Sequence, residues 1–171
     1  MRTLKKSLAL VLVVAMAVSL LSVGAFASSS TYTDSSKVGA TYAEAVDLLT
    51  GIGVVSGTTS TTLEPTGNYT REQAAKVITY MTLGKTAADA LVTGTAPFTD
   101  VAADRWSAGY IAYCVSQDII IGRGDGTFDP TGALTGYAWA KMLVTALGYN
   151  KAGEFTGPSW EIAVAKSQRQ H

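Results

Sequence analysis

The stretch FTDVAADRWSAGYIAYCVSQDIIIGRGDGTFDPTGALT, residues 98–135, decides the fold of this chain. Its first half predicts a helix over 106–117, because apolar side chains recur there at the spacing of one helical face. An apolar turn at 119–121 leads into a glycine-rich loop, and Pro130 disfavours helix at the residue before it. A second apolar run then predicts a helix over 135–147. The stretch therefore reads as one helix-loop-helix unit.

The same pattern occurs earlier in the chain at a constant offset, over residues 41–83. The matching positions are Gly57 with Gly122, Pro65-Thr66-Gly67 with Pro130-Thr131-Gly132, Thr70 with Thr135, and Ala75-Lys76 with Ala140-Lys141. Ahead of each unit, Tyr32-Thr33-Asp34 matches Phe98-Thr99-Asp100 with a one-residue gap. A fragment of a third unit begins at Phe155-Thr156-Gly157 and breaks off in a polar tail. Repetition at such a period is typical of repeat architectures.

Local signals place the helices of the first unit. Thr41 with Glu44 and Thr70 with Gln73 each have the spacing of a capping box, which predicts two helix N-termini. A glycine at position 84 suits the end of the second helix. The expected division is a signal peptide at 1–27, repeats at 28–84 and 98–150, a linker with a short helix at 85–97, and a truncated third repeat at 151–171.

The first 27 residues predict a secretory signal peptide. Arg2, Lys5 and Lys6 precede an apolar run at 8–23, and Ala25-Phe26-Ala27 provides a small-x-small cleavage site. An uncleaved membrane anchor is the alternative, because the apolar run is almost long enough to span. Arg2, Lys5 and Lys6 are three of the 13 basic residues in the sequence, which also has 13 acidic ones. The chain that follows residue 27 is therefore mildly acidic. That balance argues against nucleic-acid binding, and membrane contact is expected only through the uncleaved signal.

Taken in order and twice, the motifs resemble the S-layer homology (SLH) repeat. Those of unit two are Phe98-Thr99-Asp100-Val101, Trp106, Ile119-Ile120-Ile121-Gly122, Asp125-Gly126-Thr127-Phe128-Asp129-Pro130 and Leu134-Thr135, and unit one adds Tyr69-Thr70-Arg71-Glu72-Gln73. The resemblance implies an all-α fold of three repeats around a pseudo-threefold axis, with the first helices as a central bundle, here left incomplete. It also implies non-covalent anchoring of an exported protein to secondary cell-wall polysaccharide, often pyruvylated, at the bacterial cell surface.

Six residues are predicted to bind the glycan: Thr70, Arg71, Glu72, Asp100, Trp106 and Gly122. A pyruvate ketal is a carboxylate, and the planar fork of Arg71 suits it better than a lysine does. The free N–H groups of a first helical turn favour an anion. Glu72 would orient the arginine or accept bonds from sugar hydroxyls, and Trp106 would offer a flat face to a sugar ring.

Each of these residues also has a purely structural interpretation. Arg71-Glu72 would then be a solvated pair worth about 0–1 kcal/mol, and Trp106 part of the core. Asp34 and Asp100 would be turn residues, and Lys76 and Lys141 solvated surface lysines. Cys114, the only cysteine, is expected to be a small buried apolar residue.

The sequence predicts no catalytic residues, no metal site and no cofactor, so the chain is not expected to be an enzyme. The only histidine is the terminal residue, His171, and no nucleophile-base constellation is visible. A second hypothesis remains open beside glycan binding. The repeats would then serve assembly within a surface layer through self-association, or the chain would be a truncated fragment without a working groove.

Overall fold

The computed structural model describes residues 29–91, 98–149, 153, 155–157 and 159–167. The helices in this part are η1 (Ser29–Thr31), η2 (Ser35–Lys37), η3 (Ala40–Tyr42), α2 (Ala43–Gly51), α3 (Arg71–Leu83), α4 (Lys85–Asp89), α5 (Ala108–Ser116), α6 (Gly136–Ala146) and α7 (Trp160–Ser167). The described residues contain no strand, only an isolated antiparallel bridge between Thr70 and Ala133. The predicted mainly α fold is confirmed.

The two repeats share their loop contacts as well as their sequence. In unit one, the carboxylate of Asp34 accepts hydrogen bonds from the N–H groups of residues 63 and 64, both at 2.8 Å. In unit two, Asp100 accepts from residues 128 and 129, at 2.8 and 2.6 Å. Both aspartates therefore brace the loop of their own unit, as the turn interpretation of these residues predicted.

One of the two predicted capping boxes forms, at the N-terminus of α3. The Gln73 N–H donates to Thr70 Oγ1 at 3.3 Å, and the Thr70 N–H donates to Gln73 Oε1 at 2.8 Å. The box predicted at Thr41 is wrong. There the chain first forms η3, and the N-cap of α2 is Tyr42, which makes no side-chain capping bond.

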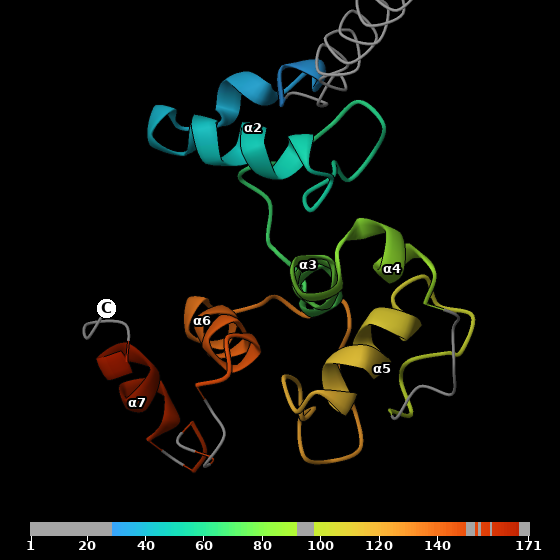
Figure 1. Ribbon diagram of the computed structural model, residues 1–171, viewed down its shortest axis with the longest axis vertical. Helices are drawn as coiled ribbons and strands as arrows, with labels where there is room; N and C mark the ends of the chain where they lie inside the picture. Colours follow the sequence, from blue (N-terminus) through green and yellow to red (C-terminus); the bar gives the residue numbers. More distant parts are fainter. Residues whose placement is uncertain (1–28, 92–97, 150–152, 154, 158, 168–171) are drawn as a thin grey trace, which may run out of the picture.

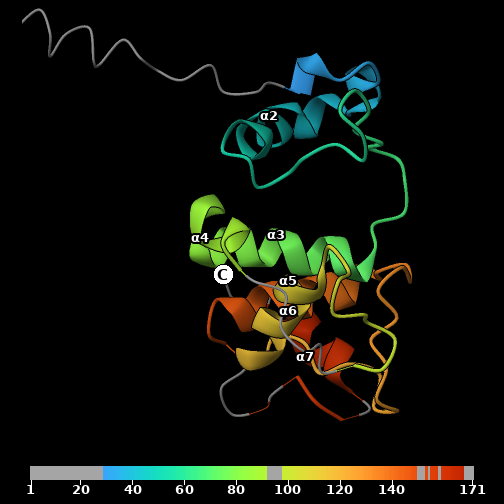
Figure 2. The same ribbon diagram turned by 90° about the vertical axis from the view of Figure 1, so that its right-hand side faces the viewer.

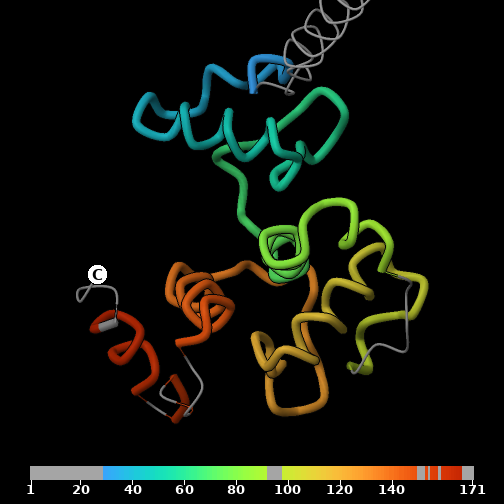
Figure 3. Tube along the Cα trace, viewed as in Figure 1, coloured from blue at the N-terminus to red at the C-terminus, as the bar shows by residue number. Residues whose placement is uncertain are grey.

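Helix α3 lies at the centre of the molecule and is seen end-on in Figure 1. It packs against α4, α5 and α6, and α6 in turn packs against α7. The second helix of unit one thus packs against the first helix of unit two, and α6 packs against α7, the helix expected to open a third unit. The first helices α2, α5 and α7 do not form the expected central bundle, because no two of them pack together in the described residues. The Cα trace in Figure 3 shows the same arrangement around α3.

Three apolar clusters hold these helices together. The largest lies between α3, α5 and α6, where Ile78, Ile111 and Phe128 are almost completely buried. Cys114 belongs to this cluster and is fully buried, which confirms its prediction as a core residue. Burial raises the pKa of its thiol to about 11. A smaller cluster joins the loop after α2 to α3 and α4 through Val54, Val77, Tyr80 and Ala88. A third joins α6 to α7 through Ala140, Phe155 and Val164.

Helix α2 packs against the short helices η1 and η3 and lies above α3 in Figure 2. Leu48 on this helix and Ile52 at its C-cap are 63% and 47% exposed, and Tyr42 at its N-cap is exposed as well. The predicted signal peptide at 1–27 lies outside the described residues. Among the helices that are described, none is both long and apolar enough to cross a membrane.

Candidate functional site

The N-terminus of α3 is docked on the loop of unit two. The N–H groups of Arg71 and Glu72 donate to the carbonyl oxygens of Gly132 and Pro130, at 3.1 and 3.0 Å. The next N–H, that of Gln73, is taken by the Thr70 side chain. The expectation that free N–H groups of this turn attract an anion is therefore wrong, because the protein itself satisfies them.

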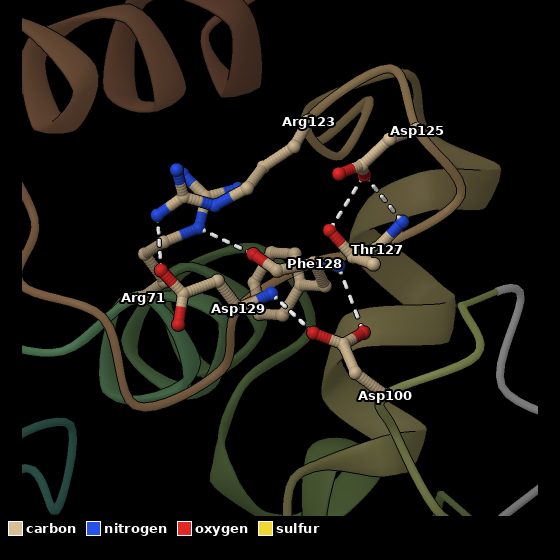
Figure 4. A network of polar contacts seen from close by, with 7 residues as sticks. All are labelled: Arg71, Asp100, Arg123, Asp125, Thr127, Phe128 and Asp129. Carbon is tan, nitrogen blue, oxygen red and sulfur yellow. Dashed lines mark hydrogen bonds and ion pairs between the residues drawn. The ribbon is translucent and has the colours of Figure 1, made fainter.

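The side chain of Arg71 is fixed by the same loop. Its Nε donates to the Phe128 carbonyl oxygen at 2.7 Å, and its Cζ lies 4.6 Å from the centroid of the Phe128 ring. Figure 4 shows this guanidinium above the ring. Burial lowers the pKa of Arg71, but an arginine stays protonated in proteins. The position of the cation is thus set by a buried aromatic ring.

Arg71 lines a cleft of about 300 Å³, here named the cationic cleft. Its other lining residues are 119–122, Phe128, Ala138, Lys141, Met142, Thr156, Gly157 and Trp160. They come from the loop of unit two, from α6 and from the segment around α7. The described lining includes one arginine and one lysine but no carboxylate. A cleft of this composition favours an anionic ligand.

Lys141 of α6 and Trp160 of α7 line the cationic cleft together. The Lys141 Nζ lies 5.1 Å from the centroid of the Trp160 ring. This distance is typical of a cation–π contact. Both side chains are half-buried, so Lys141 is only partly solvated. Burial lowers the pKa of this lysine.

A second cleft, of about 420 Å³, lies one repeat earlier and is here named the Trp106 cleft. Gly57 and Lys76 line it at the positions that Gly122 and Lys141 have in the cationic cleft. Trp106 is 52% exposed, so it is not a core residue. The described lining contains no arginine, and the Lys76 Nζ already donates to Ser56 Oγ at 2.9 Å.

Glu72 lines the Trp106 cleft but is only 6% exposed. Its carboxylate accepts from Arg105 Nε and Nη2 at 2.7 and 2.9 Å, and from Ser107 Oγ at 2.6 Å. Burial alone would raise the pKa of Glu72, but the bonds from Arg105 and Ser107 bring it below the ordinary value. Glu72 is thus paired with Arg105, and no hydrogen bond joins it to Arg71 in the described residues.

The six predicted residues therefore separate into three groups. Arg71 and Gly122 meet in the cationic cleft, Thr70, Glu72 and Trp106 line the Trp106 cleft, and Asp100 lines neither. Sequence reasoning missed Lys141 and Trp160 as site residues. The repeat held a partial signal for both residues: Lys141 matches Lys76, and Trp160 follows Phe155 by five residues where Trp106 follows Phe98 by eight.

No group of three or more metal-ligating side chains occurs in the described residues.

Residues 31–75 and 97–136 match the model of the S-layer homology domain. The chain is 31% identical over 150 residues to a "Cell surface protein" of Thermoanaerobacter kivui, which covers 87% of this chain and 19% of the relative.

A second relative is the "Surface-layer 125 kDa protein" of Lysinibacillus sphaericus, 31% identical over 144 residues. That match covers 82% of this chain and 12% of the relative, so the chain spans less than a fifth of either curated relative. No solved structure matches the chain. Because the family model matches a segment in each of its two repeats, the chain belongs to the S-layer homology domain family.

Proposed function

We propose that this chain anchors an exported protein to the bacterial cell wall by binding an acidic secondary wall polysaccharide, of the pyruvylated type, in the cationic cleft. The chain is an exported cell-surface protein, as its family and its relatives indicate. The observation that carries the proposal is the described cleft lining, which joins two cations and an indole ring without a carboxylate. The sequence as a whole has as many acidic as basic residues, so this local excess of positive charge is specific to the cleft.

Arg71 would hold the carboxylate of the glycan. Its Nε is engaged by the Phe128 carbonyl, while the described residues supply no hydrogen-bond acceptor for its two Nη groups. These groups form the planar edge that matches a carboxylate. Because the Phe128 ring and carbonyl already fix the guanidinium, binding costs less side-chain entropy than it would for a flexible cation.

Trp160 and Lys141 would hold the sugar ring next to the carboxylate. An indole face provides apolar area for the CH groups of a pyranose, and the Lys141 ammonium lies over the same ring. Gly122 lines the same cleft with its backbone. Thr70, Glu72 and Trp106 would contribute through the Trp106 cleft, and Asp100 by bracing the loop that carries Phe128.

Wall pull-down tests this function. Walls isolated from the bacterium that produces the chain are used intact and after hydrofluoric acid has removed the secondary polymer. Wild-type protein should bind the intact walls and lose binding on the stripped ones. Arg71→Ala and Lys141→Ala should each weaken binding by about 10-fold, since a hydrogen bond to a charged group is worth about 1.5–3 kcal/mol.

Lys166→Ala is the matched control, because Lys166 is exposed on α7 and does not line the cleft. It should bind like wild type. Equal binding of the wild-type protein to intact and stripped walls would refute the polysaccharide as ligand. Unchanged binding of both cleft variants would refute the cationic cleft as its site.

Self-association is a second candidate function, and helix α2 favours it. Helices α5 and α7 pack against the longer helices α3 and α6, whereas the described helices that pack on α2 are the three-residue helices η1 and η3. Leu48 on α2 and Ile52 at its C-cap remain exposed. Burying apolar side chains of this size is worth about 1.5–3 kcal/mol each, so a second copy of α2 is a fitting partner.

Light scattering coupled to size-exclusion chromatography tests this second function. Dimers should increase with protein concentration, and Leu48→Glu should abolish them. Glu161→Lys changes an exposed charge on α7 and serves as the control. A wild-type protein that stays monomeric at high micromolar concentration would exclude the dimer.

A further inference from the structure

The loop of unit two carries another arginine near the cationic cleft. Arg123 follows Gly122 and forms an ion pair with Asp129 through Nη2 and Oδ2. Both side chains are substantially exposed, at 50% and 39%. The neighbouring Asp125 is turned back on its own loop, where it accepts bonds from the N–H and hydroxyl groups of Thr127. Asp129 is therefore the carboxylate that holds Arg123.

Arg123 and Arg71 approach the same short segment from two sides. Arg71 is bound to the carbonyl of Phe128 and Arg123 to the side chain of the next residue, Asp129. Figure 4 shows both arginines reaching this segment, Arg71 at the Phe128 carbonyl and Arg123 at the Asp129 carboxylate. After burial, the charge of Arg123 is the second cause that lowers the pKa of Arg71. The two like charges thus act on each other at this segment, while the Asp129 carboxylate is paired with Arg123.

The bond between Arg123 and Asp129 is easily exchanged. An exposed ion pair contributes only about 0–1 kcal/mol, so an anion of the ligand competes with Asp129 at little cost. The backbone needs no rearrangement, because the Arg123 N–H donates to the Thr127 carbonyl at 2.9 Å whatever its side chain does. Only the side chain has to change its partner.

Resting on the function proposed above, we propose that Arg123 is a specificity-determining residue of the cationic cleft. It exchanges Asp129 for a second negative charge on the bound glycan segment, next to the charge held by Arg71 and Lys141. The cleft then prefers a dianionic sugar to a monoanionic one. Asp129 acts as the competing internal carboxylate, which keeps Arg123 neutralised until such a ligand arrives.

Three sugar probes test separately whether the cleft recognises a first and a second negative charge on its ligand. Glucose is uncharged, glucuronic acid carries one carboxylate, and glucose 6-phosphate carries about two charges above pH 7, since its second pKa is near 6. Their dissociation constants for the whole chain are measured by chemical-shift titration. Wild-type protein should bind glucose 6-phosphate about five times more tightly than glucuronic acid, and glucose least of all.

Variants of the pair then identify the residue responsible. Arg123→Ala should reduce the preference for glucose 6-phosphate to about twofold or less, because it weakens the binding of glucose 6-phosphate more than that of glucuronic acid. Arg123→Lys should restore part of this preference. Asp129→Asn should tighten glucose 6-phosphate about threefold. Asparagine is the suitable replacement because residue 129 has φ 58°, which asparagine tolerates. The melting temperature of each variant is measured to confirm folding.

The outcomes distinguish this inference from the function on which it rests. If Arg71→Ala weakens wall binding and Arg123→Ala leaves the preference between the two anionic probes unchanged, the role of Arg123 is refuted and the anchoring function stands. If wild-type protein binds stripped and intact walls equally, the anchoring function fails independently of the probes. A tighter binding of glucuronic acid than of glucose 6-phosphate also overturns the inference.

Discussion

Arg105 holds the buried carboxylate of Glu72 through two hydrogen bonds, from Nε at 2.7 Å and from Nη2 at 2.9 Å. The pair joins two repeats, since Glu72 is in the first turn of α3 and Arg105 precedes α5. Ser107 adds a third bond at 2.6 Å. The α3–α5 interface of the two repeats is therefore fixed by charge as well as by apolar packing.

Arg105→Ala should destabilise the protein by about 3 kcal/mol, because it leaves the Glu72 carboxylate buried without its cation. Chemical denaturation followed by circular dichroism measures the loss. Arg105→Lys is the control and should lose less, since it keeps the charge but not the two-bond geometry. A loss below about 0.5 kcal/mol for the alanine variant would mean that water replaces the arginine.

The same carboxylate should make stability depend on pH. The pKa of folded Glu72 lies below the ordinary value of 4.5, so its stabilising contribution is fully present above that value and is lost as the pH falls through the folded pKa. Wild-type protein should therefore lose more unfolding free energy than Glu72→Gln on acidification from about pH 6 to about pH 3. Parallel losses in the two proteins would assign the acid sensitivity to other groups.

Asp34 and Asp100 have to be separated from Glu72 in this experiment, because the pKa of each is also lowered. For Asp34 the main cause is the bond from the Leu63 N–H. For Asp100, burial opposes the shift and the N–H groups of residues 128 and 129 outweigh it. The unfolding free energies of Asp34→Asn and Asp100→Asn, measured over the same pH range, give the contribution of each aspartate to the loss of stability in acid.

Gly122 should tolerate no side chain. Its φ is +71°, and an added Cβ would lie 2.4 Å from Phe98 Cε1 and 2.8 Å from the Thr127 carbonyl oxygen. Gly124 is the matched control, because its φ is +89° but nothing lies within 4 Å of an added Cβ. Both alanine variants bear backbone strain of about 1 kcal/mol. The steric clash should make Gly122→Ala the less stable variant by about 2 kcal/mol more, as measured by urea denaturation, and equal losses would contradict it.

Helices with strong local signals could be predicted from the sequence. Thr70 with Gln73 gave the start of α3, and Thr135 that of α6, because capping bonds join residues three apart. The Thr41 box failed because the preceding 3₁₀ turn at Ala40–Tyr42 already satisfies the entry to α2. Local spacing alone cannot distinguish these two cases.

The candidate site was harder to predict than the helices, because its contacts are long-range. Arg71 was found from its motif, but its partner Phe128 is 57 residues away. Glu72 and Arg105 are 33 residues apart, and nothing in the sequence between them indicates the pair. Trp160 was missed as a site residue because the third unit follows at a different spacing, so one constant offset does not align it with Trp106.

Lys76 and Lys141 occupy matching positions in the two repeats and should differ in function. Lys141 shares its cleft with Arg71 and lies over Trp160. Lys76 instead donates to Ser56 and lies 5.3 Å from the Tyr80 ring, in a cleft without a described arginine. Lys141→Ala should weaken binding to intact walls by about 10-fold, and Lys76→Ala by less than about threefold with a small loss of stability. Wall titrations and thermal melts of both variants decide this. Equal loss of wall binding would mean that the two clefts bind the polymer alike, and that Arg71 does not set the difference between them.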